Sequence, residues 1–373
     1  MRAGAIRFVA VLSALVLFPF TAERALAGEH GSDCGSPSDI HDGWVIGSPE
    51  QQGFDPALLC AMGKGVAGGR LPSADSIVVV RHGVLVYERY FHLPGPTSSF
   101  EPAAIRHAGH SMTKSVVSLL VGIAVDRGQI TDLDASIFSY FPEYADLRSP
   151  EKDRITLRSL LTMSDGLDSS DFFQVGGHSF DRDPYRYILA TRLAREPGVA
   201  FEYNNATTEL IGAILQKATG KTVDVLARED IFTPLGIESV DWKPRLGNGY
   251  PMANSGLGLR PRDRAKIGQL VLNGGVWQGK QIVSTSWIRQ STRAHISAPD
   301  QYTYGFHWWL GHSLSNDRVI AWTAALGSRA QKTIIVPELD LVVVFNASIR
   351  SANMIAPEIE LLNQYILPAI LQR

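Results

Sequence analysis

GHSMTKSVVSLLVGIAVDRG, residues 109–128, is the stretch on which both the fold and the candidate site depend. Beyond Lys114 almost every residue up to Val125 is apolar, and Gly128 is a suitable helix end. Apolar residues on all sides predict an α-helix that is buried on every face. Because the helix interior is apolar, the polar end with Ser111 and Lys114 must open onto a site of some kind.

Ser111 and Lys114 stand three residues apart, which places both on one helix face and lets the hydroxyl meet the amine. Burial disfavours an ammonium group and can lower a lysine pKa by up to about 3–5 units, which yields an amine able to take the serine proton. The positive end of the helix would stabilise the alkoxide and the oxyanion that follows. The alternative is a buried lysine that pairs with a carboxylate for structural reasons, and the four residues alone leave both open.

The same Ser-x-x-Lys spacing recurs at Ser149 and Lys152. There Pro150 and the charged run EKDR predict an exposed turn, so this copy is interpreted as a surface feature. The apolar helix that follows, and not the Ser-x-x-Lys pattern itself, therefore distinguishes the candidate site from the second copy.

Two stretches rich in β-branched residues lie near opposite ends of the chain. SIVVVRHGVLVYERYF, residues 76–91, has two such runs around a His-Gly turn, which is the pattern of a hairpin. KTIIVPELDLVVVFNAS, residues 332–348, has two runs split by Pro-Glu-Leu-Asp, and an apolar periodic segment follows at 355–371. Because no βαβ units alternate, we expect an α+β fold, an α/β sandwich, with one antiparallel sheet built from both chain ends and flanked by helices.

Helical patterns and loops occupy the middle of the chain. We therefore expect residues 56–373 to form one domain. Its α/β part is expected at about 56–110 and 300–373, and its mostly helical part at about 111–299. Residues 28–55 are rich in Gly, Ser, Pro and Asp and are expected to form an extended lead-in.

The first 27 residues are expected to be a signal peptide. Arg2 and Arg7 precede FVAVLSALVLFPF, and Ala25-Leu26-Ala27 is a small-x-small cleavage site. About 13 apolar residues are too few for a bilayer, which needs roughly 20, and no later stretch is long enough. We expect cleavage after about Ala27, a periplasmic or secreted protein and no stable membrane anchor.

Charge and cysteine content bear on partners and on disulfide formation. The formal net charge is −2, and loss of residues 1–27, with three arginines and one glutamate, leaves 32 basic and 36 acidic residues, or −4. A mildly acidic chain argues against nucleic acid as a partner. Cys34 and Cys60, the only two cysteines, would meet an oxidising compartment, where a disulfide is favoured over two buried free thiols.

FEYNNATTEL contains Tyr203 and Asn205, the only Tyr-x-Asn of the sequence, just before a helical pattern. A tyrosine close to a lysine amine can relay a proton, and an asparagine amide can hold a substrate carbonyl. Taken alone, the motif is better explained as a loop in which Asn205 caps the helix.

Together the two motifs resemble the penicillin-recognising serine hydrolase superfamily, in particular the branch of class C β-lactamases and esterases that includes 6-aminohexanoate-dimer hydrolases. The resemblance implies a β-lactamase/transpeptidase-like fold, Ser111 as the acylated nucleophile and Lys114 as its proton partner. Tyr203 would protonate the leaving group and later activate water, and Asn205 would hold the third position of the second motif. The likeness covers most of the chain beyond the signal peptide and includes HSMTKSVVSLLVGIAVDRGQI, LRSLLTMSDGLD, EYNNATTELIGAIL, NSGLGLRPRDRAKIGQLVLNGGVWQGKQIVS, YGFHWWL and IIVPELDLVVVF.

The third motif of the superfamily is altered in this chain. Where relatives carry Lys-Thr-Gly, His-x-Gly or Gly-x-Gly-Gly-Gln, this chain has AALGSRAQ. Gly327 and Gln331 match, whereas two glycines are replaced, one of them by Arg329. The resemblance carries over the backbone N–H of Ser328, which with that of Ser111 would form an oxyanion hole, and loss of one such donor costs about 100- to 1000-fold in rate. For Arg329 two interpretations stay open: it reads an acidic group of the substrate, or it blocks the cleft.

Other chemistries find little support in the sequence. No serine completes Gly-x-Ser-x-Gly, which disfavours an α/β-hydrolase, and no His-Glu-x-x-His or Cys-His set could hold zinc. Neither a metal nor a cofactor is therefore expected, and His110 is interpreted as structural. Tyr304, Trp308 and Trp309 either wall a substrate cleft or belong to the core.

We therefore expect an exported serine hydrolase that cleaves amide or ester bonds in a small molecule or short peptide through an acyl-enzyme. One alternative is a β-lactamase or D-alanyl carboxypeptidase, against which the missing Lys-Thr-Gly counts. Another is a non-catalytic relative that binds peptidoglycan fragments or a β-lactam. The sequence names neither the substrate nor the oligomeric state.

Overall fold

A nine-stranded sheet dominates the protein, whose computed structural model describes residues 34–91, 102–174, 177–347 and 358–371. The strand order is β1-β3-β2-β14-β13-β12-β11-β10-β9, and every neighbouring pair is antiparallel except β1 and β3. The strands are β1 (Val45–Ile46), β2 (Ser76–Arg81), β3 (Val84–Tyr90), β9 (Ile296–Ser297), β10 (Thr303–Tyr304), β11 (Trp309–Ser315), β12 (Arg318–Gly327), β13 (Gln331–Val336) and β14 (Leu341–Asn346).

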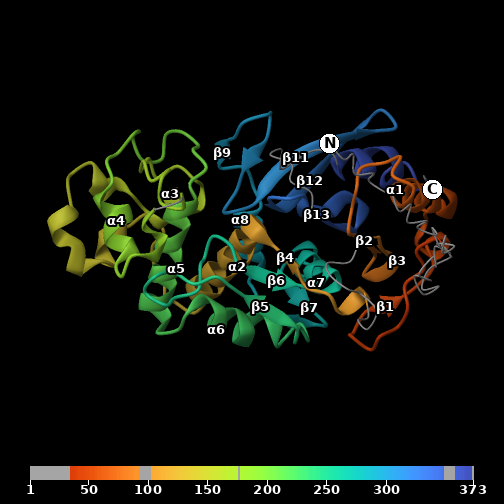
Figure 1. Ribbon diagram of the computed structural model, residues 1–373, viewed down its shortest axis with the longest axis horizontal. Helices are drawn as coiled ribbons and strands as arrows, with labels where there is room; N and C mark the ends of the chain where they lie inside the picture. The colour runs from red at the N-terminus through yellow and green to blue at the C-terminus, as the bar shows by residue number, and fades with distance from the viewer. Residues whose placement is uncertain (1–33, 92–101, 175–176, 348–357, 372–373) are drawn as a thin grey trace, which may run out of the picture.

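The sheet joins the two ends of the chain, as the sequence predicts. β2 and β3 form the expected hairpin, and β2 pairs with β14. β13 and β14 are separated by the expected turn at Pro337–Leu339. Figure 1 shows the early strands beside the blue strands from the end of the chain. The prediction of an α+β fold with one antiparallel sheet from both chain ends is confirmed.

Helices cover both faces of the sheet. Val78 and Val344 face a core that includes residues of α2 and α7, whereas Val79 and Val343 face a second core that includes residues of α1 and the C-terminal helical segment. Successive side chains of a strand point to opposite faces, so a strand covered on both sides reads as an unbroken apolar run. The helices are α1 (Pro56–Ala67), α2 (Thr113–Asp126), α3 (Leu157–Leu161), α4 (Pro184–Ala190), α5 (Asn205–Thr219), α6 (Val223–Ala227), α7 (Pro261–Leu272), α8 (Thr285–Ser291) and α9 (Glu358–Leu361), which runs into a π-helical turn at Leu362–Ile366.

The middle of the chain is more mixed than a purely helical part. Helices α3, α4 and α5 lie at the far end of the molecule from β2 and β3, with α2 between them (Figure 1). In contrast, α7 also comes from the range 111–299, yet it packs onto β2, β13 and β14. Residues of this range also form two small sheets, the first together with β4 from just before it. Their orders are β4-β6-β5 and β7-β8, and their strands are β4 (His107–Ala108), β5 (Val240–Trp242), β6 (Leu257–Leu259), β7 (Val276–Trp277) and β8 (Lys280–Gln281).

The segment before α1 is fastened to the rest of the protein. A disulfide joins Cys34 to Cys60 of α1, which confirms the expected pairing. The buried guanidinium of Arg262 on α7 forms ion pairs with Glu88 on β3 and Asp42 of this segment. Because β1 also pairs with β3, the described part of the lead-in extends the sheet.

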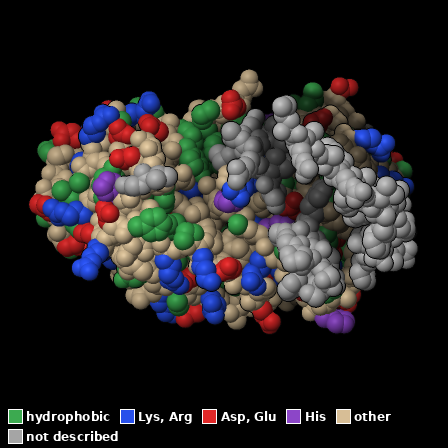
Figure 2. Space-filling view, viewed as in Figure 1, with side chains coloured by type: hydrophobic (Ala, Val, Ile, Leu, Met, Phe, Trp, Pro, Cys, Tyr) green, Lys and Arg blue, Asp and Glu red, His purple; other side chains and the backbone are tan. Residues whose placement is uncertain are grey.

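Two sequence predictions concern the surface and the membrane. Among the described residues, no helix is both long and apolar enough to cross a bilayer, and the expected signal peptide at residues 1–27 lies outside them. On the face shown in Figure 2, basic and acidic side chains are interspersed.

Candidate active site

Ser111 lies in a 3-10 turn, His110–Met112, that leads directly into α2. The Thr113 hydroxyl donates to the carbonyl of His110 at 2.7 Å and closes this turn. His110 has a φ of +48°, in the left-handed region that non-glycine residues rarely adopt, and such strain clusters at functional sites. Among the described residues no side chain caps the N-terminus of α2, so the positive end of this helix is available to the group that reacts at Ser111.

Lys114 lies in the first turn of α2 and is 1% exposed. Its Nζ atom contacts three oxygen atoms: Ser111 Oγ at 3.2 Å, Asn205 Oδ1 at 2.8 Å and the carbonyl oxygen of Asn254 at 2.9 Å. None of these acceptors is a carboxylate, which speaks against the structural ion pair that the sequence had left open. The expected burial of the helix is also confirmed, because residues 113–124 are all buried.

The environment of Lys114 favours the uncharged amine. Burial lowers the pKa of Lys114 to about 7, and the negative charge of Glu209 opposes this shift in part. An ammonium group would donate to all three oxygens. The neutral amine donates to two of them and turns its lone pair toward Ser111 Oγ, which is the arrangement a general base needs.

Tyr203 completes a compact group around Ser111. The Lys114 Nζ atom lies 5.1 Å from the centre of the Tyr203 ring, which stacks on the Trp309 ring at 6.1 Å. Burial raises the pKa of Tyr203 to about 12, and hydrogen bonding with the Ser111 side chain opposes this shift. The phenol is therefore protonated at neutral pH and next to both Ser111 and Lys114.

The two adjacent asparagines divide the tasks of capping and site formation. Asn204 is the N-cap of α5, because its Oδ1 atom accepts from the backbone N–H of Ala206 at 3.0 Å. Its amide nitrogen donates to the Leu167 carbonyl at 2.9 Å. Asn205 instead binds Lys114, so the interpretation of Asn205 as a helix cap is wrong and the cap is its neighbour.

The end of β12 lies directly against the turn that carries Ser111. A Cβ atom built on Gly327 would fall 2.1 Å from the carbonyl oxygen of Gly109. Ser328 follows Gly327 directly and Ser111 lies two residues after Gly109, so the two serines belong to neighbouring segments. The two backbone N–H groups expected to form the oxyanion hole therefore belong to segments in contact.

Arg329 and Ala330 occupy a turn that glycine would adopt at lower cost. Their φ angles are +58° and +59°, which explains why the resemblance places glycines at these two positions. The side-chain amide of Gln331 donates to the Arg329 carbonyl at 3.0 Å, and the buried Arg264 donates to Gln331 Oε1 at 2.7 Å. The Arg329 side chain itself is exposed and lies near His110, whose pKa is lowered by burial and then by the charge of Arg329.

The second Ser-x-x-Lys copy forms no such site. The Lys152 amine donates to the Leu189 carbonyl at 2.6 Å, and Ser149 Oγ accepts only from the Lys152 backbone N–H at 3.2 Å. The prediction that this copy is a surface feature agrees with the exposed residues around it.

Comparison with known proteins identifies the family. The family model described as Beta-lactamase matches residues 61–362, which is most of the chain. The chain belongs to the beta-lactamase family. The predicted superfamily is thereby confirmed, and with it the prediction that this beta-lactamase-family chain is a serine hydrolase.

Relatives of this beta-lactamase-family chain carry different names. The 6-aminohexanoate-dimer hydrolase of Paenarthrobacter ureafaciens is 25% identical over 297 residues, which cover 72% of this chain and 71% of that protein. A penicillin-binding protein homologue from Caulobacter crescentus is 17% identical with a TM-score of 0.69, over 86% of this chain and 98% of that chain. A family VIII carboxylesterase is also 17% identical, with a TM-score of 0.68 over 87% and 98% of the two chains. The solved structures support the fold alone.

The three aromatic residues for which the sequence left two interpretations open lie in different environments. Trp308 and Tyr304 are 0% and 1% exposed and belong to the two cores, which agrees with the second of the two interpretations that the sequence left open. Trp309 is the residue that reaches the site, through its contact with Tyr203.

Sequence reasoning missed three groups around Lys114. The Asn254 carbonyl binds its amine, the Glu209 carboxylate acts on its charge, and the His307 ring faces its backbone carbonyl at 3.3 Å. For Glu209 a signal existed, because an acidic residue among the apolar positions of a helix is costly to bury without a partner. The Asn254 carbonyl and the His307 ring lie in segments outside helices and strands, where no periodic sequence pattern indicates their position.

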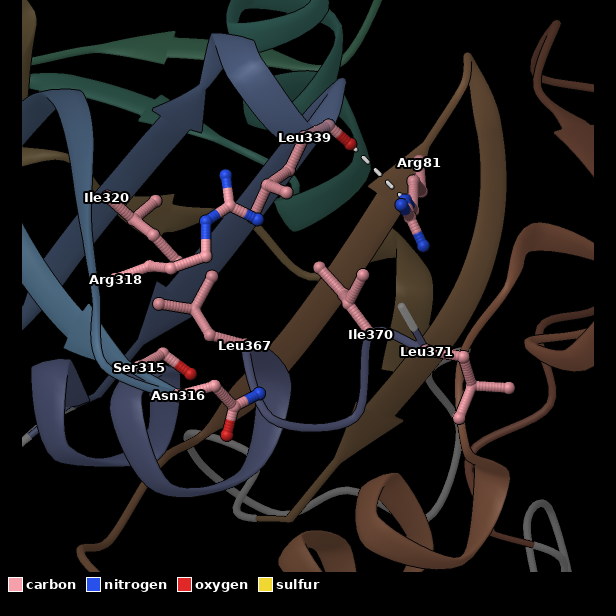
Figure 3. A pocket seen from close by; sticks show the side chains of 9 residues that line it. All are labelled: Arg81, Ser315, Asn316, Arg318, Ile320, Leu339, Leu367, Ile370 and Leu371. Atoms are coloured by element: carbon pink, nitrogen blue, oxygen red, sulfur yellow. Dashed lines mark hydrogen bonds between the residues drawn. The ribbon is translucent and has the colours of Figure 1, made fainter. Parts of the chain in front are cut away.

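Neither a metal site nor a separate reaction site emerges from the rest of the described chain. In the described ranges no group of three or more His, Cys, Asp or Glu residues could hold a metal ion. A pocket of about 320 Å³ lies beside the end of β12 that is remote from Gly327, and Arg81 and Leu339 form a hydrogen bond at its edge (Figure 3). Its lining includes none of the residues around Ser111.

Proposed function

We propose that this protein is an exported serine hydrolase that cleaves an amide or ester bond of a small molecule or short peptide through an acyl-enzyme on Ser111. The observation that carries the proposal is the buried Lys114 amine, 3.2 Å from Ser111 Oγ and held by Asn205 and Asn254. A lysine in that setting, with a pKa near 7, supplies what a serine lacks as a nucleophile.

In the acylation step, Ser111 Oγ bonds to the substrate carbonyl carbon while its proton passes to the Lys114 amine. The carbonyl oxygen takes up the negative charge, which the backbone N–H groups of Ser111 and Ser328 and the N-terminus of α2 stabilise. The bond to the leaving amine or alcohol then breaks. The Tyr203 phenol gives its proton to the departing atom and recovers one from the Lys114 ammonium, so the protons balance.

In the deacylation step, water takes the place of the leaving group. One water proton passes through Tyr203 to Lys114 as the water oxygen bonds to the acyl carbon. The tetrahedral intermediate then releases Ser111 Oγ, which recovers its proton from Lys114. The acid product leaves, and the site returns to its starting protonation state.

Export is supported by two independent features. The predicted signal peptide at residues 1–27 combines a basic start, a short apolar run and a small-x-small site. The disulfide between Cys34 and Cys60 fits an oxidising compartment such as the periplasm or the exterior.

The nucleophile is tested by covalent labelling with a fluorophosphonate. Wild-type protein and a Ser149→Ala control, altered only in the second Ser-x-x-Lys copy, should both be labelled, whereas Ser111→Ala should not. Persistent labelling of Ser111→Ala would show that another residue is the nucleophile.

The substrate class is tested with a panel. Short p-nitrophenyl esters, linear aminohexanoate oligomers, D-amino-acid peptides and a chromogenic cephalosporin separate an esterase or amidase from a β-lactamase or carboxypeptidase. Ser111-dependent turnover of the cephalosporin in preference to the others would favour the β-lactamase alternative. The absence of turnover for every member, together with reversible ligand binding, would favour a non-catalytic relative.

A further inference from the structure

Glu209 is a buried carboxylate one helical turn beyond Asn205 on α5, with 1% of its surface exposed. Its two oxygens accept hydrogen bonds from the backbone N–H groups of Ala253 and Asn254, at 2.8 and 3.0 Å. Burying a carboxylate is costly unless its oxygens are satisfied, and here two main-chain donors satisfy it. The side chain therefore clamps the segment at residues 253–254 onto α5.

That clamped segment reaches the reacting group directly. The carbonyl oxygen of Asn254 accepts a hydrogen bond from Lys114 Nζ at 2.9 Å. Asn205, on the same helix as Glu209, accepts from the same amine at 2.8 Å. Helix α5 thus holds the Lys114 amine twice, once through the Asn205 side chain and once through Glu209 and the backbone of Asn254.

We propose that Glu209 is a positioning residue for Lys114, which fixes the Asn254 carbonyl against the amine and controls the pH range in which Lys114 acts as a base. The inference rests on the proposed function, since it concerns the group that takes the proton of Ser111. In the described part of the chain, the hydrogen bonds of the Glu209 carboxylate go to the backbone at residues 253–254 and not to Ser111 or Tyr203, and its charge acts on Lys114.

Charge adds to the geometric argument. The negative charge of Glu209 raises the pKa of Lys114 against the larger effect of burial. Burial in turn raises the pKa of Glu209 to about 7, and the hydrogen bonds from Ala253 and Asn254 and the charge of Lys114 oppose it. The two groups titrate in the same pH range. The acid limb of the reaction, which is the part of the pH profile where the rate rises with pH, therefore reflects the titration of both groups together.

The other titratable groups that face this pair stay uncharged near neutral pH. The His307 ring, behind Lys114, has a pKa lowered to about 3 by burial. The pKa of Tyr203 is raised to about 12. Burial also raises the pKa of Tyr185, whose phenol senses the charge of Glu209. A change in the acid limb on substitution of Glu209 is therefore attributable to the pair itself.

The test is the pH dependence of Ser111 labelling by a fluorophosphonate, which needs no knowledge of the substrate. In this reaction Ser111 Oγ bonds to phosphorus, fluoride leaves and the serine proton goes to Lys114. In Glu209→Gln the charge is absent and one amide oxygen cannot serve both N–H groups. The labelling rate above the acid limb should fall several-fold, and the limb should move to lower pH by roughly half a unit or more, because less negative charge favours the neutral amine.

Asp165 offers a matched control. It is also a buried carboxylate, 1% exposed, and it accepts from the backbone N–H of Leu167 at 3.0 Å, but it is not among the groups that act on the Lys114 charge. Asp165→Asn should lower the melting temperature and leave the acid limb at its wild-type position. Glu209→Asp, which keeps the charge but shortens the reach, should reduce the rate with the limb near its wild-type position.

Two results would overturn the inference. In the first, Glu209→Gln labels at every pH like wild type. In the second, Glu209→Gln is labelled more slowly but its acid limb stays at the wild-type position, which is the result expected if Glu209 were only structural. If Glu209→Gln does not fold, an acid limb displaced in Glu209→Asp overturns the inference equally. Failure of the proposed function is distinct, since wild-type protein would then not be labelled at Ser111.

Discussion

The carbonyl oxygen of Gly109 occupies the space that a side chain on Gly327 would need, 2.1 Å from the position of its Cβ atom. Gly109 precedes the turn with Ser111, and Gly327 ends β12 just before Ser328. Real Cβ contacts are never this short, so only glycine lets the strand approach the turn so closely. The proposed oxyanion hole depends on this contact between two glycines.

Replacement of Gly327 by alanine should therefore damage the reaction. The added methyl group must push the end of β12 away from Gly109 and with it the N–H of Ser328, and a misplaced oxyanion donor costs about 100- to 1000-fold in rate. Labelling rate and ester turnover measure the effect, and circular dichroism checks the fold. Ser328→Ala is the comparison: because its donor is main chain, it should lose far less. Equal activity of Gly327→Ala and wild type would contradict the assignment.

The pKa of Lys114 predicts the acid limb of the reaction. Below pH 7 the amine becomes an ammonium ion and cannot accept the Ser111 proton, so the rate should rise with pH and level off above about 7. In Lys114→Met the rate at neutral pH should collapse, and the remaining activity should rise only toward higher pH, where hydroxide replaces the base. An unchanged profile would remove Lys114 from the mechanism.

The adjacent asparagines should separate stability from activity. Asn204→Ala removes the cap of α5 and the bond to the Leu167 carbonyl, which should cost about 2 kcal/mol of unfolding free energy. Asn205→Ala removes an acceptor of the Lys114 amine and should lower the rate roughly 10- to 100-fold with a smaller effect on stability. Urea unfolding and ester turnover measure the two quantities. The reverse pattern would show that the cap has been assigned to the wrong residue.

Backbone strain at Arg329 predicts that its replacement by glycine stabilises the protein. A non-glycine residue in the left-handed region destabilises the folded protein by about 1–2 kcal/mol, and glycine removes this strain. Glycine also gives the unfolded chain more freedom, which offsets part of the gain. Arg329→Gly should therefore raise the free energy of unfolding by roughly 0.5 kcal/mol. Arg329→Val should lower it, since a β-branched residue fits that region worst. Thermal unfolding measures both. A loss of stability in Arg329→Gly would mean that the side chain contributes more than its conformation costs.

Local sequence patterns were sufficient for the elements that carry the site. The apolar run after Lys114 predicted a helix buried on every side, and α2 is that helix. The prediction was possible because a helix buried on all faces needs apolar residues at nearly every position. The same holds for β2, β3, β13 and β14, whose unbroken apolar runs reflect a sheet covered on both faces.

Long-range contacts escaped the sequence. Nothing near Asn254 indicates that its carbonyl binds an amine 140 residues away, and the position of Glu209 on α5 shows its role only once residues 253–254 lie against it. Capping of the helix by Asn205 was the interpretation of the motif taken alone, but Asn204 is the cap, because one residue of register decides which amide binds the start of α5 and which reaches Lys114. Trp308 and Trp309 are neighbours with opposite directions, and only the sheet decides which one reaches Tyr203.

The sequence by itself determined the family, the antiparallel sheet from both chain ends, the buried helix after Ser111 and the residue types that a serine hydrolase needs. The sheet and the helix follow from composition and periodicity within short stretches, whereas the family and the residue roles follow from the resemblance that the motifs carry. Only the tertiary structure decided which polar atoms meet at the Lys114 amine, that Glu209 stands behind them and that β12 closes onto Gly109. Such contacts depend on distances between segments that are far apart along the chain. A shift of one ångström or of one residue in register is enough to form or break a hydrogen bond or to change the strength of a charge interaction.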